Sequence, residues 1–331
     1  PWDIVVFNRI SANESLLAAQ QDYRNKGGIL IYDIDDLIFN PEKARLQDSF
    51  KKRDLEGQNA RLAAMARIKS SALAADLMTV TTDALAQEAK KMGQSAFVIP
   101  NSLPPQMPPA IAKQKDIINI CYLSGTATHD RDFKECESAI IEILATYDNV
   151  VFNLVGELAL CDQLSEHKRV IRHELMSHNN MLQFLSSMDI NLAPLELDNE
   201  FTECKSELKI FEAAYYGVPT VASTTAAFSQ VIKNGENGNL ASSSQEWFDA
   251  LVALVENKIH RNALGVMAKK TIATVFHVNF IAAKLHSFYS YLLANKEKSL
   301  AEITNEQLYH FVCANKPLQH EVMSHCALFN A

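Results

Sequence analysis

Short apolar runs alternate with amphipathic stretches along most of the chain, a pattern typical of α/β proteins. Residues 3–7 predict a buried strand, residues 15–25 predict a helix, and the run ILIYD after Gly27-Gly28 predicts a second strand. A strand, a helix and another strand in this order form the unit of a parallel sheet. Later apolar runs predict further strands at DLMTV, FVIP, INICYLSG, VVFNLVG, RVIRHE, DINLAPL and TVAS.

A proline-rich segment without apolar periodicity divides this pattern into two domains. The segment PPQMPPAIAKQK predicts a linker at residues 105–116. We therefore expect an N-terminal domain at residues 1–104 and a C-terminal domain at residues 117–275. One long helix is predicted over residues 261–295, and residues 276–331 hold its second half and a tail whose role the sequence does not indicate.

The stretch CKSELKIFEAAYYGVPTVAS, residues 204–223, predicts a helix, a tight turn and a strand. Ser206 is the expected N-cap, because a serine hydroxyl can accept a hydrogen bond from the first free amides of a helix. Gly217 is expected in the left-handed conformation just past the helix. Pro219 follows where a helix cannot continue.

Positive charge gathers at the predicted start of this helix. Lys205, Ser206 and Lys209 lie where free amides and the positive end of the helix dipole already suit an anion such as phosphate. Glu212 lies one helical step from Lys209 on the same side. A carboxylate there can accept two hydrogen bonds from a ribose diol, and an ordinary surface ion pair is the alternative interpretation.

Composition limits the classes of function. The chain has 331 residues, enough for two domains, and 48% of them are apolar, as in ordinary globular proteins. A formal net charge of −8 argues against a nucleic-acid binder, so a phosphate site must be local. Its six cysteines are scattered without metal-ligand spacing, which favours reduced thiols and a cytoplasmic protein without a metal site.

The ends and the apolar runs of the sequence give two further expectations. No apolar run approaches the roughly 20 residues of a membrane span, and no signal peptide is visible. The chain opens at Pro1 directly before a strand, so we expect it to be part of a longer or multidomain protein.

Three carboxylates follow the second predicted strand. Asp33, Asp35 and Asp36 stand where open parallel sheets place their ligands, at the carboxyl ends of strands. They could bind a cation, act as a base or cap the next element, and capping is the interpretation that the pattern alone favours.

A basic helical stretch follows. Residues 42–75 predict one long helix or two, with several lysines and arginines. A solvated face is the favoured interpretation. Peripheral docking on an anionic membrane surface is the alternative, because basic amphipathic helices can bind such surfaces.

The stretch from Cys204 to Ser223 resembles the donor-binding helix of GT-B-fold glycosyltransferases of the retaining, family-four-like group. Many members have K-S-x-x-K-x-x-E, then small residues, G-x-P and a strand. The matching residues are Lys205, Ser206, Lys209 and Glu212. The resemblance implies that Lys209 meets the donor diphosphate and that Glu212 holds the ribose.

One position departs from the commoner family pattern. That pattern has another glutamate eight residues earlier, which touches the transferred sugar, and this chain has Cys204 there. Nearby candidates for the same role are Glu196, Asn199, Glu200 and Glu203.

Other segments resemble the same family. SGTATHDRDF is similar to a motif that faces the donor phosphates, which implies donor-binding roles for Gly125, Thr126, His129 and Arg131. For His129, a structural role is the alternative. The loop that starts at His173 corresponds to the place where the family holds the nucleotide base. YDIDDLIF corresponds to a segment beside the donor sugar, which makes Asp35 and Asp36 candidate catalytic residues beside Lys209.

The resemblance implies the GT-B fold: two Rossmann-like, doubly wound parallel-sheet domains facing a cleft, with a truncated N-terminal domain here and a last helix that crosses back to cover it. It implies transfer of a sugar from a nucleotide-diphosphate sugar to a glycan or lipid-linked acceptor, with retention, and no cofactor or metal ion. Such relatives make bacterial cell-surface polysaccharides such as lipopolysaccharide, which suggests the cytoplasm or the inner face of the membrane. A nucleotide-sugar epimerase and a non-catalytic nucleotide-sugar-binding module are the alternatives.

Overall fold

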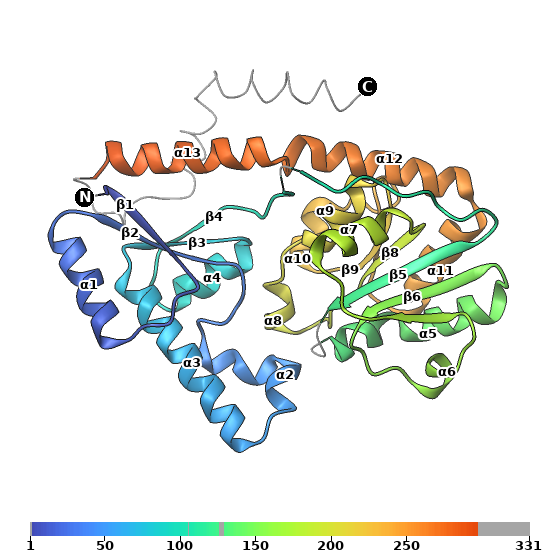
Figure 1. Ribbon diagram of the computed structural model, residues 1–331, viewed down its shortest axis with the longest axis horizontal. Helices are drawn as coiled ribbons and strands as arrows, with labels where there is room; N and C mark the ends of the chain where they lie inside the picture. Colours follow the sequence, from blue (N-terminus) through green and yellow to red (C-terminus); the bar gives the residue numbers. More distant parts are fainter. Residues whose placement is uncertain (1, 105, 126–128, 297–331) are drawn as a thin grey trace. The chain divides into compact units, whose positions relative to one another are not determined.

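The computed structural model describes residues 2–104, 106–125 and 129–296, and these form two compact units, each built on one sheet (Figure 1). The first unit contains residues 2–101, 204–206 and 278–296 of the described chain. The second contains Ser102–Glu203 and Glu207–His277. Both sheets are entirely parallel and carry helices, so the predicted α/β class is confirmed.

The first unit has four strands that neighbour one another in chain order. They are β1 (Ile4–Asn8), β2 (Ile29–Ile34), β3 (Leu77–Val80) and β4 (Ala96–Val98). Helices α1 (Glu14–Asn25), α3 (Leu55–Ala74) and α4 (Asp83–Lys91) lie below this sheet in Figure 1, and α13 (Val278–Ala294) lies above it. Side chains cap the helices as short polar residues commonly do: Asn13 accepts a hydrogen bond from the Leu16 amide, and Thr82 accepts one from the Leu85 amide.

Helix α13 completes the apolar core of the first unit. Phe288 and Leu292 are fully buried and pack with Ile31 and Phe97 of the sheet, with the Phe97 and Phe288 rings 5.0 Å apart. The prediction of one helix over residues 261–295 is wrong. Helix α12 (Lys258–Val275) ends before Phe276, which packs in the core of the second unit, whereas α13 packs in that of the first. One straight apolar stripe cannot serve two separate cores.

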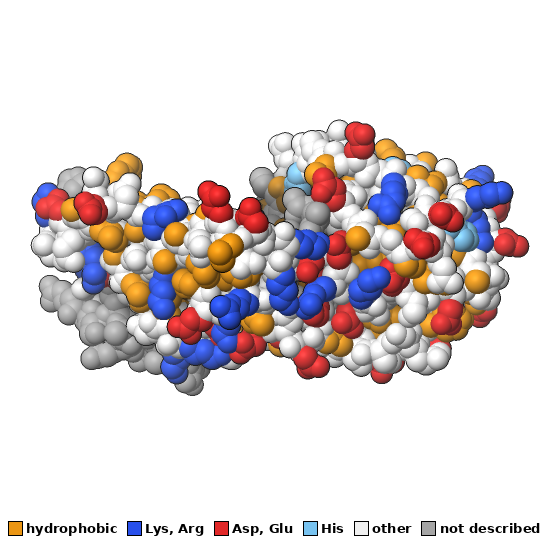
Figure 2. Space-filling model, turned by 90° about the horizontal axis from the view of Figure 1, so that it is seen from below, with side chains coloured by type: hydrophobic (Ala, Val, Ile, Leu, Met, Phe, Trp, Pro, Cys, Tyr) orange, Lys and Arg blue, Asp and Glu red, His pale blue; other side chains and the backbone are white. Residues whose placement is uncertain are grey.

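The basic stretch after β2 forms two short pieces and then one long helix of 20 residues, which lies within the predicted range. They are a 3-10 turn η1 (Pro41–Leu46), α2 (Asp48–Lys51) and α3. Most of its lysines and arginines are exposed or half-buried. Figure 2 shows lysines and arginines interspersed with acidic side chains on the face that it presents. None of the helices in the described ranges is both long and apolar enough to cross a membrane.

The second unit has a six-stranded sheet in the order β10-β9-β8-β5-β6-β7. Its strands are β5 (Ile118–Gly125), β6 (Val150–Gly156), β7 (Val170–His173), β8 (Ile190–Ala193), β9 (Thr220–Ser223) and β10 (Asn239–Ala241). Its helices are α5 (Asp130–Thr146), α6 (Asp162–Ser165), α7 (His178–Ser186), α8 (Glu200–Glu203), α9 (Leu208–Tyr215), α10 (Ala226–Val231), α11 (Ser244–Glu256) and α12. The apolar runs predicted all of these strands except the short β10.

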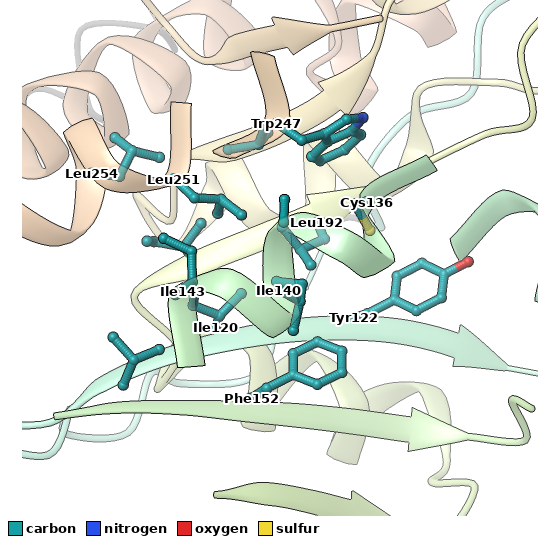
Figure 3. Close-up of a cluster of buried hydrophobic side chains, with 14 of the residues drawn as sticks. Ile120, Tyr122, Cys136, Ile140, Ile143, Phe152, Leu192, Trp247, Leu251 and Leu254 are labelled. Atoms are coloured by element: carbon teal, nitrogen blue, oxygen red, sulfur yellow. The ribbon is translucent and has the colours of Figure 1, made fainter. Parts of the chain in front are cut away.

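Alternate residues of β5 serve two different cores, as the two-residue period of a strand requires. Ile120 and Tyr122 pack with α5 and α11 in the larger cluster, part of which is shown in Figure 3. Cys121 and Leu123 pack on the opposite face, in a cluster that also holds residues of α7 and α9. Helices therefore cover both faces, and the sheet is doubly wound.

Helix α9 touches α12 at two glycines. A Cβ atom on Gly265 would lie 2.0 Å from the carbonyl oxygen of Gly217, too close for any side chain. Gly217 itself has a φ of 67°, the left-handed conformation predicted for it. The turn after α9 therefore rests directly on the backbone of α12.

Gly265→Ala is expected to lower the free energy of unfolding by roughly 1–3 kcal/mol, because the added methyl group must push two backbones apart. Chemical denaturation measures this loss. Val266→Ala is the matched control on the same helix: Val266 is 66% exposed, and its truncation is expected to cost less than about 0.5 kcal/mol. Equal stabilities of the two variants would contradict the close contact.

Candidate functional site

Helix α9 carries Lys209 and Glu212 in the second unit. The helix begins at Leu208, with Glu207 in the N-cap position and without a side-chain cap. The prediction of Ser206 as the N-cap is therefore wrong. The first helical hydrogen bonds run from the amides of Ile210 and Phe211 to the carbonyl of Glu207, so the helix starts too late for Ser206 to cap it.

The carboxylate of Glu212 is buried, with 6% of its side chain exposed. His178, the first residue of α7, places Nε2 2.8 Å from Oε1 of Glu212. Burial raises the pKa of Glu212 above its ordinary value, while the hydrogen bond from His178 and the positive charge of Lys209 act in the opposite direction. The contacts with His178 and Lys209 thus offset part of the effect of burial on this acid.

The ammonium group of Lys209 is also held inside the unit. Its Nζ atom is buried and lies 4.6 Å from the centre of the Tyr122 ring. The backbone carbonyl of Lys209 accepts a hydrogen bond of 3.3 Å from Nδ2 of Asn191 in β8. Both the position of the helix start and the direction of the side chain are therefore fixed by the sheet.

The end of β5 closes tightly on the end of β6. Gly125 has a φ of 76°, and its carbonyl accepts a hydrogen bond of 3.0 Å from the Glu157 amide. A Cβ atom on Gly156 would lie 2.2 Å from the same carbonyl oxygen, so only glycine fits at position 156. Thr126, the next candidate for donor binding, lies outside the described residues.

A network of charged side chains joins the start of α5 to the segment after β8. Helix α5 starts at Asp130, so Arg131 lies in its first turn. Nδ1 of His129 lies 2.7 Å from the Asp132 carboxylate, which also accepts a hydrogen bond from the Glu196 amide. Glu196 in turn binds Arg131 at 2.9 Å and Asn199 at 2.7 Å. The structure thus brings together three of the predicted donor-binding residues.

His173, predicted to lie near the nucleotide base, is the last residue of β7. Its Nε2 lies 3.0 Å from Oδ1 of Asn153, and its ring packs against Phe184 at 4.6 Å. Asn153 is held by Asn119 in the neighbouring strand. Burial lowers the pKa of His173, which favours its neutral form.

The acidic residues after β2 form a separate group in the first unit. Arg9 donates to Asp35 at 2.9 Å and to Asp36 at 3.4 Å, from a backbone with a φ of 54°. Lys205 lies 3.6 Å from Asp36. Asp33 instead accepts from the hydroxyl of Thr79 and supports the sheet.

Ser206 also has a partner in the first unit. Its hydroxyl accepts a hydrogen bond of 3.0 Å from Nδ2 of Asn101. The hydroxyl that was predicted to cap α9 therefore contacts Asn101.

Sequence reasoning missed the residues that hold the candidates in place. His178, Tyr122 and Asn153 contact Glu212, Lys209 and His173, but each belongs to a different element, and no spacing pattern indicates such contacts. Arg9 was missed for the same reason. In the described ranges, no group of three or more His, Cys, Asp or Glu side chains is arranged to hold a metal ion.

Residues 120–257 match the protein-family model described as Glycosyl transferases group 1. A search of curated proteins found no match. Sucrose-phosphate synthase from Thermosynechococcus elongatus has a similar structure over 88% of this chain and 74% of that one, with a TM-score of 0.61 and 14% identity.

Two further solved structures are similar. HepE of Anabaena, in complex with UDP-glucose, matches over 88% of this chain and 79% of that one, with a TM-score of 0.59 and 16% identity. TarM of S. aureus matches over 86% of this chain and 54% of that one, with a TM-score of 0.61 and 14% identity. At these identities the structural similarity shows the fold.

His178→Ala is expected to raise the pKa of Glu212 further, because the buried carboxylate loses the hydrogen bond from His178, which lowers that pKa. Titration of the Glu212 side-chain carboxyl by carbon NMR measures this shift. His260→Ala, on α12, is the control and is expected to leave the titration unchanged. An unchanged or lower pKa in the His178 variant would show that this contact does not stabilise the ionised acid.

Proposed function

We propose that the donor of this glycosyltransferase is a nucleotide-diphosphate sugar, held in the second unit. The match of residues 120–257 to the glycosyl transferases group 1 model and the GT-B fold support this proposal. The observation that carries the proposal is the pairing on one helix of the buried Glu212 carboxylate with the Lys209 ammonium. A cation and an acid one helical turn apart suit two neighbouring parts of one ligand, a phosphate and a ribose diol.

Lys209 is proposed to stabilise the departing diphosphate. Departure of a group that carries several negative charges is the main barrier in such a transfer, so a fixed cation at this position is expected to contribute more than any other group. The start of α9 adds backbone amides and a positive dipole end. We propose that these groups replace a divalent metal ion.

Glu212 is proposed to bind the two ribose hydroxyls. An ionised carboxylate has only acceptor sites, which match a diol that donates two hydrogen bonds. His178 and Lys209 favour the ionised form inside the protein, as this role requires. The base would lie beside His173, whose neutral ring favours contact with an uncharged heterocycle.

A uracil nucleotide is the first donor to test. HepE, similar over 88% of this chain, was solved with UDP-glucose and also with UDP and glucose. TarM was solved with UDP and sugar-containing ligands. We therefore propose a UDP-sugar as donor and a glycan or lipid-linked molecule as acceptor.

The donor site is proposed to include seven further residues: Gly125, Thr126, His129, Arg131, Asn199, Lys205 and Ser206. Arg131 contacts Glu196 through Nη1, and because a guanidinium group carries five N–H donors, this ion pair need not open for Arg131 to contribute to the diphosphate site. Asp35 and Asp36 of the first unit are proposed to position the acceptor or the sugar.

Retention of anomeric configuration and a role in bacterial cell-surface polysaccharide synthesis are proposed from the family resemblance alone. The same holds for a site of action in the cytoplasm at the inner face of the membrane.

Lys209→Ala and Glu212→Ala are each expected to lower sugar transfer by about 10²–10³-fold, because one removes the charge opposite the leaving diphosphate and the other removes the ribose contact. Release of UDP from UDP-sugars, with a panel of glycan and lipid-linked acceptors, measures transfer. Lys258→Ala, an exposed lysine on α12, is the control and should keep the parent rate.

If both variants fold and transfer sugar at the rate of the parent protein, the assignment of Lys209 and Glu212 to the donor site is refuted. A parent chain that binds UDP-sugars but transfers to no acceptor would support the binding module instead. Transfer that persists in a metal chelator is expected, and its loss would refute the metal-free proposal.

Asp35→Asn is expected to lower kcat by about 10²-fold, because a misplaced acceptor or sugar reacts slowly, while the affinity for UDP stays within twofold. Steady-state kinetics and calorimetry with UDP measure the two effects. Asp22→Asn, an exposed acid paired with Lys26 on α1, is the control. A large loss of UDP affinity in the Asp35 variant would place this acid in nucleotide binding instead.

A further inference from the structure

We propose that Tyr122 is a positioning residue: its buried ring is the seat that fixes the Lys209 ammonium. The ammonium nitrogen lies 4.6 Å from the ring centre, inside the distance of about 6 Å at which a cation is attracted to an aromatic face. Both groups are shielded from solvent, since Tyr122 is 0% exposed and Nζ of Lys209 is buried.

The Tyr122 ring is itself held by two further rings. Phe133 of α5 stacks on Tyr122 with centres 5.5 Å apart and planes at 23°. Phe152 of β6 stacks on Phe133 at 5.6 Å and 18°. Both phenylalanines are 0% exposed, and stacked pairs of this kind are favourable arrangements. The core therefore fixes the ring before any ligand arrives.

A ring is a suitable seat for this cation. A buried ammonium needs a partner that compensates for lost water, and an aromatic face does so without accepting the charge into an ion pair. A carboxylate at the same place would compete with a diphosphate for the ammonium. The ring itself neutralises no charge on Lys209, and it holds the side chain in one place.

The hydroxyl of Tyr122 is not needed for the contact between its ring and Lys209. It is buried and has no hydrogen-bond partner among the residues that the structure describes, and in Figure 3 it points away from the other labelled side chains. Burial raises the pKa of Tyr122 well above its ordinary value, so the hydroxyl stays protonated. The contact with Lys209 depends on the ring, so Tyr122→Phe should preserve it, whereas Tyr122→Leu should abolish it.

The first measurement needs no ligand. Proton–carbon NMR of the parent should show the ε-methylene of Lys209 displaced upfield from the other lysines, because it lies over a ring face; its absence from Lys209→Ala assigns the signal. The displacement should remain in Tyr122→Phe and disappear in Tyr122→Leu. A Lys209 signal at the ordinary lysine position in the parent would overturn the proposal, whether or not any variant folds.

The second measurement uses UDP and rests on the proposed function. Tyr122→Leu is expected to weaken UDP binding about tenfold, or about 1.4 kcal/mol, by calorimetry. Tyr122→Phe is expected to stay within twofold of the parent. Phe152→Leu is the matched control: it removes a ring from the same stack and destabilises the same core, but it leaves the ring under Lys209, so UDP binding should stay within twofold.

Equal losses in Tyr122→Leu and Phe152→Leu would show that Tyr122 acts only through core stability, and this result would overturn the proposal. Parent-like UDP binding in Tyr122→Leu would overturn it too. A parent that does not bind UDP would refute the proposed donor, while the NMR displacement would still test the seat for Lys209.

Discussion

A carboxylate and an ammonium are buried close together on one short helix, and the remainder of the second unit is arranged to tolerate them. An unpaired buried charge costs several kcal/mol, so each needs compensation. Glu212 receives it from His178 and from Lys209, and Lys209 receives part of it from the Tyr122 ring. Both charges are thus kept in place and away from bulk water.

Helix α9 can hold these charges because its own position is set by packing. Phe211 stacks on Phe276 with ring centres 3.9 Å apart, and Gly217 rests on Gly265. The charged network around Glu196 differs from the α9 pair in one respect. There Arg131 contacts an acid, Glu196, whereas the ammonium of Lys209 contacts an uncharged ring, that of Tyr122.

Much of the fold was predictable from the sequence, because strands of buried parallel sheets are continuous apolar runs between turn residues. Lys209 and Glu212 could be predicted as site residues from the family resemblance, because the motif that contains them is a short local spacing. The break near Phe276 was not predictable, because the two helices share a similar apolar pattern and differ only in the core that they serve. Contacts such as His178 with Glu212, 34 positions apart, depend on the packing of α7 against α9, which no local pattern encodes.

The contact between Gly125 and Gly156 limits how this protein can vary. At position 156 even a methyl group would collide with the backbone of the adjacent strand, and this glycine has no side chain that could react. In a saturation-mutagenesis survey, such a position looks as intolerant as a reactive one. A position at this edge of the sheet that tolerates no substitution can therefore be important for packing or for reactivity. Substitutions that change only size test the packing, and substitutions that change charge test the reactivity.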